Sequence, residues 1–414
     1  MKNNESKVYG DGRGVGAWRT SDASAQPPHE MTGEERELSF TDPARGSDDL
    51  SRHHSQSHGR AEAHRSPRLS ESAGTSGKTP LRPVLCLVGP TASGKSAAAY
   101  ALALRWATEI VTADSRQLYR DMPIGTDQPP ASWQREVAHH LVGIAPPDQS
   151  WNAGRFCRAA EPILARLHEA GRLPIVVGGT GLYLRALLYG LMAAPPSDQA
   201  LRRELTEQAA REGTISLHER LRAVDPASAE VISPGDGQKL IRALEIYLLT
   251  GRSRSAWQAE HGFHAPRYRH LLIGLRLPRP VLYRRIEERV GEMVRRGLVE
   301  EARRLWEAGY DERHNAMRGL GYRQLLRAFR GEWSIEAAIE ATIRETKRYA
   351  KRQLTWFRHQ AGLQWIDLDG GESAEAVAAR LHRITAQQWG AGGPCAIMAE
   401  FFTRESTHAH TSSI

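Results

Sequence analysis

Cysteine and long apolar runs are both scarce in this chain. Its 414 residues include three cysteines, Cys86, Cys157 and Cys395, and their wide spacing without a CxxC pair predicts neither a disulfide framework nor a zinc site. No stretch approaches the ~18 apolar residues of a membrane span, and the first residues lack the apolar segment of a secretory signal. We therefore expect a cytoplasmic protein without membrane association.

Apolar periodicity is almost missing from residues 1–80. This segment is rich in Ser, Gly, His, Arg and Glu, and it cannot bury enough surface to offset its conformational entropy. We predict a disordered extension over 1–80 and a tail over 387–414. The whole chain is still 40% hydrophobic, which is enough for about two domains. Its net charge of +8 is weak evidence for a polyanionic partner.

The clearest signal is a glycine-rich loop between a short apolar run and an alanine-rich helix. The run 84–88 predicts a buried strand. It leads into a complete G-x-x-x-x-G-K-[ST] motif formed by Gly89, Pro90, Thr91, Ala92, Ser93, Gly94, Lys95 and Ser96. Backbone N–H groups and the helix N-terminus attract a phosphate chain there, while Lys95 suits the outer phosphate and the Ser96 hydroxyl suits Mg²⁺. The loop alone does not distinguish a nucleotide from another diphosphate.

Two further apolar runs are each followed by a polar residue with chemical potential. Residues 109–113 predict a strand followed by Asp114, and residues 174–178 predict one that ends in a glycine turn containing Thr180. Parallel strands place their carboxyl ends at one edge of a sheet, so both residues are expected beside the phosphate loop. Asp114 is a candidate base or metal ligand, or it caps the next segment. Thr180 either donates a hydrogen bond to a leaving oxygen or caps the next helix.

The middle of the chain interrupts this α/β pattern. Residues 196–266 consist of successive helical segments, and an apolar run at 269–275 resumes the strand pattern. We predict a parallel α/β core formed by 81–195 and 267–386, with a helical insertion over 196–266. The later helical segment 335–358 carries many basic residues with Trp356 and Phe357 among them. That pattern suits RNA backbone contact and base stacking, with a solvated helix face as the alternative.

Five motifs, in order along residues 83–385, closely resemble those of the tRNA isopentenyltransferase family, also called tRNA dimethylallyltransferases. They are the loop 89–96, the tetrapeptide 114–117, and the stretches 178–183, 318–323 and 351–358. The resemblance implies a P-loop nucleoside-triphosphatase-like parallel sheet. It also implies transfer of a dimethylallyl group from dimethylallyl diphosphate, with Mg²⁺, to N6 of the adenosine next to the anticodon on its 3′ side, in tRNAs that read codons beginning with U.

The resemblance assigns roles to individual residues as well. It makes Asp114 the general base, sets Thr180 near the oxygen that bridges carbon and phosphorus, and places the diphosphate of the prenyl donor in the loop 89–96 with Ser96 on the metal. Arg285 and Arg289 are further candidates to balance the diphosphate charge. The implied contacts to the tRNA anticodon stem-loop are Asp114, Ser115, Arg116, Gln117, Arg202, Gln238, Lys239, Leu240, Ile241, Arg242, Arg318, Gly319, Leu320, Gly321, Tyr322, Arg323, Lys351, Arg352, Gln353, Leu354, Thr355, Trp356, Phe357 and Arg358.

Three positions depart from the family pattern, and two other functions compete with it. Gln128 replaces a usual lysine, Gly143 a common aspartate, and Ser96 the more frequent threonine, whose hydroxyl serves Mg²⁺ equally well. An adenylate isopentenyltransferase acting on free AMP, ADP or ATP would not need the basic helix 335–358. An RNA-binding ATPase or kinase would need a Walker-B aspartate, which we cannot place. In the absence of a heptad pattern, we expect a monomer.

Overall fold

A sheet of six parallel strands, in the order β3-β2-β4-β1-β5-β6, forms the centre of the core. The computed structural model describes residues 81–262, 265–389, 396 and 398, so the predictions for 1–80 and for most of 387–414 fall outside it. The strands are β1 (Pro83–Val88), β2 (Ile110–Thr112), β3 (His139–His140), β4 (Ile175–Gly178), β5 (Arg269–Arg276) and β6 (Leu363–Asp367). The predicted α/β class with a parallel sheet is confirmed.

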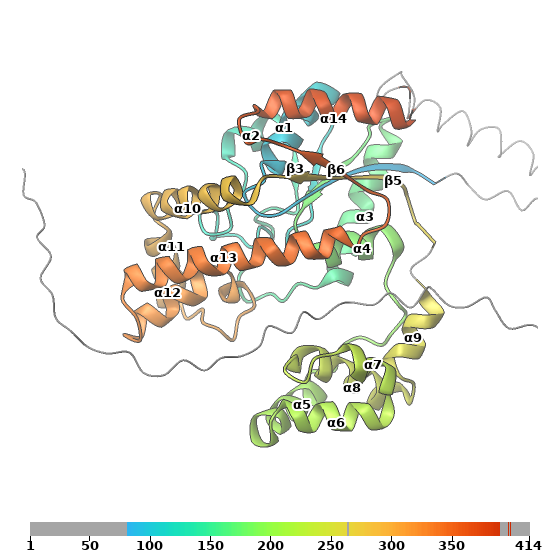
Figure 1. Ribbon diagram of the computed structural model, residues 1–414, viewed down its shortest axis with the longest axis vertical. Coiled ribbons are helices and arrows are strands. Elements are labelled where there is room, and N and C mark those ends of the chain that lie inside the picture. Colours follow the sequence, from blue (N-terminus) through green and yellow to red (C-terminus); the bar gives the residue numbers. More distant parts are fainter. Residues whose placement is uncertain (1–80, 263–264, 390–395, 397, 399–414) are drawn as a thin grey trace, which may run out of the picture. The chain divides into compact units, whose positions relative to one another are not determined.

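Both faces of the sheet are covered by helices. On β1, Leu85 and Leu87 belong to one buried cluster, whereas Val84, Cys86 and Val88 belong to another, as the two-residue period of a strand requires. Helices α1 (Lys95–Trp106) and α14 (Ala374–Trp389) cover the first face, and α3 (Ala153–Glu169) and α4 (Gly181–Tyr189) the second (Figure 1). Strands buried on both sides are apolar throughout, which is why they appear as short continuous runs in the sequence.

The segment between α4 and β5 is helical and has its own small core. It contains α5 (Gln199–Glu212), α6 (Thr214–Val224), α7 (Pro226–Val231), α8 (Gly237–Thr250) and α9 (Arg254–His261). Leucines of α5, α6 and α8, among them Leu205, Leu221 and Leu240, meet in a buried cluster of their own. This cluster is separate from the clusters on the two faces of the sheet.

A further helical layer follows β5 and extends the carboxyl edge of the sheet. It comprises α10 (Arg279–Arg295), α11 (Leu298–Glu307), the 3₁₀ turn η1 (Ala316–Arg318), α12 (Tyr322–Phe329) and α13 (Ile335–Arg358). Its buried side chains pack with Tyr119, Met122 and Ala145 from the loops around α2 (Ala131–Glu136) and β3. Those loops follow the carboxyl ends of β2 and β3, so this layer reaches the edge where Asp114 lies.

The sequence patterns predict no element beyond Arg358, but the structure has β6 and α14 there. Strand β6 is the edge strand beside β5, and most of its residues are only half-buried. Its apolar signal is therefore weak. Helix α14 is buried through Val377, Ala378 and Leu381 against α1.

Candidate active site

The glycine-rich loop adopts backbone conformations with positive φ, which glycine tolerates better than other residues. Gly89 has a φ of +148°, and a Cβ there would lie 2.7 Å from the Leu275 carbonyl oxygen. Gly94, at φ +87°, is the N-cap of α1, and Ala92 also has a positive φ. These conformations turn the loop so that α1 begins at Lys95, with its N-terminus at the end of the loop. The loop thus joins strand β1 to helix α1 as the sequence predicts, and its binding of a phosphate chain stays a prediction.

Positive charge gathers around this loop. Lys95 is half-buried, and burial lowers the pKa of its ammonium group to about 8, although the nearby Asp114 opposes the shift. On α10, Arg289 donates a hydrogen bond of 2.8 Å to Thr91 Oγ1 and pairs with Asp127 at 3.2 Å. Arg285 of the same helix donates to the Gly370 carbonyl and lies close to Gly94. Both arginines proposed to balance a diphosphate are thus at the loop.

Asp114 and Thr180 lie side by side at the carboxyl ends of β2 and β4. The Ser115 N–H donates to Thr180 Oγ1 at 3.0 Å, and Asp114 Oδ1 accepts from the N–H groups of Arg116 at 2.8 Å and Gln117 at 3.4 Å. Asp114 Oδ2 has no hydrogen-bond partner among the described residues. Thr180 is the N-cap residue of α4, but its side chain makes no cap hydrogen bond there, so its hydroxyl is not used in capping. Asp114 thus fixes the following turn through one oxygen, while its role as a base or metal ligand through the other stays a prediction.

Two adjoining cavities meet at Asp114. The smaller, of about 60 Å³, is lined by Lys95, Ser96, Asp114 and Asp127. The larger, of about 270 Å³, is lined by Asp114 together with a group of arginines, Arg116, Arg318, Arg323 and Arg352. Both cavities also share Thr91, Thr126, Arg289 and Tyr349. The phosphate loop and the arginine-bearing surface therefore open onto one continuous crevice around Asp114.

Helix α13 is joined to the phosphate loop by a buried glutamine. Gln353 Oε1 accepts the Thr91 N–H at 2.8 Å, and Gln353 Nε2 donates to the Gly179 carbonyl at 3.0 Å. A Cβ at Gly179 would lie 2.1 Å from Gln353 Nε2, and one at Gly181 would lie 1.9 Å from Trp356 Nε1. The glycines of this turn are required because α13 packs directly on it.

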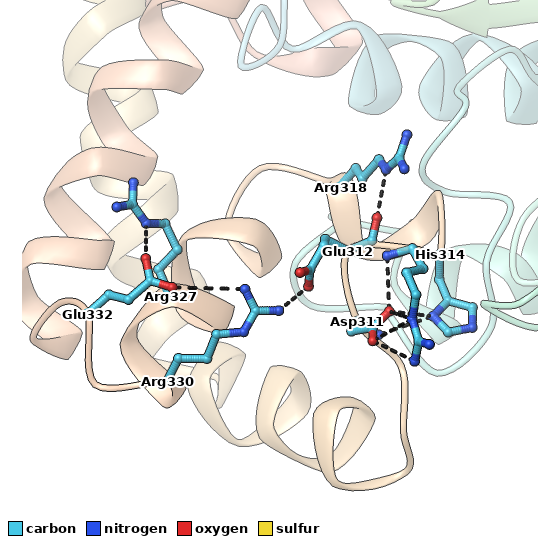
Figure 2. A network of polar contacts seen from close by, with 8 residues as sticks. Asp311, Glu312, His314, Arg318, Arg327, Arg330 and Glu332 are labelled. Carbon is cyan, nitrogen blue, oxygen red and sulfur yellow. Dashed lines mark hydrogen bonds and ion pairs between the residues drawn. The ribbon is translucent and has the colours of Figure 1, made fainter. Parts of the chain in front are cut away.

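Three of the arginines in the larger cavity are held by neighbouring groups. Arg116 donates to the Asn315 carbonyl and Arg323 pairs with Glu345. Arg318 donates to the Glu312 carbonyl at 2.7 Å, and Glu312 in turn pairs with Arg330, which continues the network to Glu332 and Arg327 (Figure 2). Burial and the neighbouring guanidinium groups lower the pKa of Arg323. Like charges gathered in one cavity favour an anionic ligand.

Several residues expected to meet tRNA have side chains that lie inside the protein instead. Leu240 and Phe357 belong to the apolar clusters, so base stacking on Phe357 is ruled out in this conformation. Tyr322 is fully buried, and Gln117 and Gln353 are nearly so, with their polar atoms bonded internally. Two glycines of the predicted set are buried as well, Gly319 and Gly321. The other side chains reach the surface to different extents. The exposed ones are Gln238, Lys239, Lys351, Thr355, Trp356 and Arg358, and the half-buried ones are Ser115, Leu320, Ile241 and Leu354.

The two arginines predicted to bind tRNA from the helical segment hold a buried carboxylate. Arg202 and Arg242 both pair with Glu245, whose side chain is 0% exposed, at 2.9 and 2.5 Å. Arg242 also donates to the Pro195 carbonyl, and the Asp198 N–H donates to Glu245. Both guanidinium groups thus stabilise a buried carboxylate, a role that the sequence pattern did not indicate.

Glu301 supports the carboxyl edge of the sheet, although it belongs to none of the five family motifs. It is 0% exposed and accepts hydrogen bonds from the N–H groups of Ile124 and Gly125, both at 2.9 Å, and from the Tyr322 hydroxyl at 2.6 Å. A sequence signal exists, because Glu301 occupies the buried face of α11 together with Leu298, Ala302 and Leu305. A charged residue on the apolar face of an amphipathic helix indicates a buried partner.

Two of the departures from the family pattern, Gln128 and Gly143, are neighbours. Gln128 Nε2 donates to the carbonyls of Gln117 at 3.1 Å and Tyr119 at 2.7 Å, and Gln128 Oε1 lies 3.5 Å from the position of a Cβ on Gly143. The Gly143 N–H in turn donates to the Gln117 carbonyl. A neutral amide thus supports the backbone of 117–119 at this point.

The fold is that of a P-loop-like α/β protein, in which Lys95 and Arg289 line a cavity at the carboxyl edge of the sheet. Comparison with known proteins gives the family. The family model described as IPP transferase matches residues 117–360, and the chain belongs to that family.

Named relatives span most of the chain. A tRNA dimethylallyltransferase of Syntrophobacter fumaroxidans is 45% identical over 76% of this chain and 92% of that protein, and one of Geobacter metallireducens is 48% identical over 68% and 91%. Among solved structures, the tRNA isopentenylpyrophosphate transferase of Bacillus halodurans matches with a TM-score of 0.56 at 35% identity, over 78% of this chain and 99% of that one. A eukaryotic dimethylallyltransferase acting on tRNA matches with a TM-score of 0.64 at 25% identity, over 74% and 78%.

Proposed function

We propose that this protein is a tRNA dimethylallyltransferase. It transfers the dimethylallyl group of dimethylallyl diphosphate to N6 of the adenosine 3′-adjacent to the anticodon, and releases diphosphate. The observation that carries the proposal is the crevice in which Asp114 lies between the phosphate loop and the arginine-lined cavity. The family membership and the named relatives support the same reaction.

The smaller cavity suits the diphosphate of the donor. Lys95 and Arg289 supply positive charge, and the N-terminus of α1 adds its dipole. The described residues contain no group of three His, Cys, Asp or Glu side chains that could hold a metal alone. However, Ser96 lines this cavity, and so does Thr112, whose buried Oγ1 has no hydrogen-bond partner among the described residues. These oxygens fit a hydrated Mg²⁺ held by Ser96 and the diphosphate, which would neutralise charge on the leaving group.

Transfer then needs one bond to form, one to break and one proton to move. The N6 nitrogen bonds to C1 of the dimethylallyl group while the bond from C1 to the diphosphate oxygen breaks. Asp114 Oδ2 accepts the proton that N6 loses, and Asp114 Oδ1 stays fixed by the N–H groups of Arg116 and Gln117. The Thr180 hydroxyl, held beside Ser115, is suited to donate to the oxygen that leaves.

The acceptor adenine must leave the anticodon loop stack to reach this carbon. Extrusion costs a few kcal/mol, which contacts to the flanking phosphates and bases repay. The arginines of the larger cavity can neutralise those phosphates. Exposed Trp356, which packs on Gly181 next to Thr180, offers an aromatic face close to the same place.

The two alternatives fit less well. An enzyme for free adenylates is not supported, because the relatives and one solved neighbour are named for action on tRNA. None of those relatives is named as an ATPase or kinase, so they do not support that alternative either.

Among the described residues, no helix has the length and apolarity needed to cross a bilayer. The monomeric state and the cytoplasmic location remain predictions.

Labelled dimethylallyl diphosphate, incubated with the purified protein and Mg²⁺, tests the proposal. We expect label in unmodified tRNA or an anticodon stem-loop, none in AMP, and no hydrolysis of ATP. Label in AMP at a comparable rate would favour the adenylate enzyme. Replacing the acceptor adenosine by guanosine is the matched control and should abolish incorporation.

A further inference from the structure

Glu301 holds a loop that, like Asp114, lines both cavities of the crevice. The loop 123–127 contributes Gly125 and Thr126 to the larger cavity and Thr126 and Asp127 to the smaller one. Two consecutive backbone N–H groups of this loop, from Ile124 and Gly125, end on the two carboxylate oxygens of Glu301. The third donor is the Tyr322 hydroxyl, and burial next to Glu301 raises the pKa of Tyr322.

The fit around this carboxylate is tight. A Cβ at Gly125 would lie 2.5 Å from the Tyr322 hydroxyl oxygen, so glycine is needed where the loop meets Tyr322. A carboxylate accepts hydrogen bonds without donating any, which matches three converging donors. A glutamine has the same shape, but its NH₂ group would face one of these donors and leave it unsatisfied.

The loop is joined in turn to Asp114 through Gln117. Gln117 Nε2 donates to the carbonyls of Asp127 at 2.8 Å and Thr126 at 3.3 Å. The Gln117 N–H is one of the two that fix Asp114 Oδ1. Hydrogen bonds and the covalent chain between them thus link Glu301 through the loop 123–127 and Gln117 to Asp114, which lines both cavities.

We propose that Glu301 is a positioning residue for the transfer reaction, acting on Asp114 through the loop 123–127 and Gln117. This inference rests on the proposed function. It assigns to the buried face of α11 a role that the tRNA-contacting motifs do not include, and it makes Tyr322 a part of the same support.

The test is a double-mutant cycle on the full chain. Glu301→Gln, Gln117→Ala and the double variant are compared with the wild type for the rate of transfer in a single turnover with enzyme in excess. Affinity for an anticodon stem-loop and thermal stability are measured in parallel. Glu300→Gln is the matched control, because Glu300 is the exposed neighbour on the same helix.

We expect Glu301→Gln to slow transfer about tenfold, equivalent to about 1.4 kcal/mol, with stem-loop affinity and the Glu300→Gln rate unchanged. In the Gln117→Ala background the same substitution should slow transfer less than about twofold, because the path is already broken. Its effect on thermal stability should persist there. A merely structural role would give the same loss of rate in both backgrounds.

Two results would overturn the inference. One is a double variant whose loss of rate equals the product of the losses in the two single variants, and the other is a Glu301→Gln rate equal to wild type. If Glu301→Gln does not fold, Tyr322→Phe replaces it in the cycle, because it removes one donor and keeps the carboxylate. A smaller loss of transfer rate in Tyr322→Phe that disappears in the Gln117→Ala background supports the inference. The same loss of rate in both backgrounds contradicts it. A wild-type protein that transfers nothing to tRNA would instead refute the proposed function.

Discussion

The cluster of Arg202, Arg242 and Glu245 gives a direct test of whether these arginines act first on the protein or on tRNA. Arg202 donates to Glu245 through Nε at 2.9 Å and through its terminal nitrogen at 3.0 Å. Glu245 is 0% exposed, whereas the side chains of Arg202 and Arg242 are 37% and 27% exposed. Burial alone would raise the pKa of Glu245, but the hydrogen bonds from both arginines lower it.

We expect Arg202→Ala to destabilise the protein by about 2 kcal/mol. Breaking a fully buried ion pair costs about 3–5 kcal/mol. Here the loss is reduced, because Arg202 is partly solvated and Arg242 still pairs with the carboxylate. In the Glu245→Ala background the same substitution should cost less than about 0.5 kcal/mol, because its partner is already gone.

Urea unfolding followed by circular dichroism measures these differences, with Arg203→Ala as the matched control, since Arg203 is its exposed neighbour. Because the pKa of Glu245 is lower in the folded state, its contribution is present above the unfolded pKa of about 4.3 and disappears as the pH falls through the folded value. The difference between wild type and Arg202→Ala should therefore shrink in acid. If Arg202→Ala unfolds at the wild-type urea concentration but loses affinity for tRNA, the structural role is refuted.

Three other predictions address the crevice. Asp114→Ala should abolish transfer and leave tRNA binding largely intact, and a near wild-type rate in a single-turnover assay would remove the base assignment. The lowered pKa of Lys95, about 8, means that its positive charge is lost as the pH rises through that value. kcat/KM for dimethylallyl diphosphate should then fall up to about tenfold per pH unit above pH 8, and a flat profile to pH 9.5 would contradict this. Gly181→Ala should displace Trp356 and lower transfer severalfold, because its Cβ would overlap the indole; Trp356→Ala in the same chain should relieve the overlap, and intrinsic fluorescence would report the movement.

Features of the fold and site that depend on residues close together in the sequence could be predicted, whereas those that depend on distant residues could not. The loop 89–96, the turn 178–181 and helix 335–358 were identified because strand, glycine turn and helical period are properties of neighbouring residues. Asp114 and Thr180 were placed together by the rule that parallel strands end at one edge, and the Ser115 N–H does link them. Strand β6 was missed because an edge strand is half-buried and has little apolar signal.

The sequence by itself determined the phosphate loop, the parallel α/β core and the family, because each follows from residue types at short, fixed spacings. Only the tertiary structure decided which polar side chains are occupied by the protein. Gln353 bonds to Thr91 across 262 residues of sequence, Glu301 reaches Ile124 across 177, and Arg202 reaches Glu245 across 43. A buried polar group needs a partner wherever the fold brings one, and spacing along the chain carries no record of that partner.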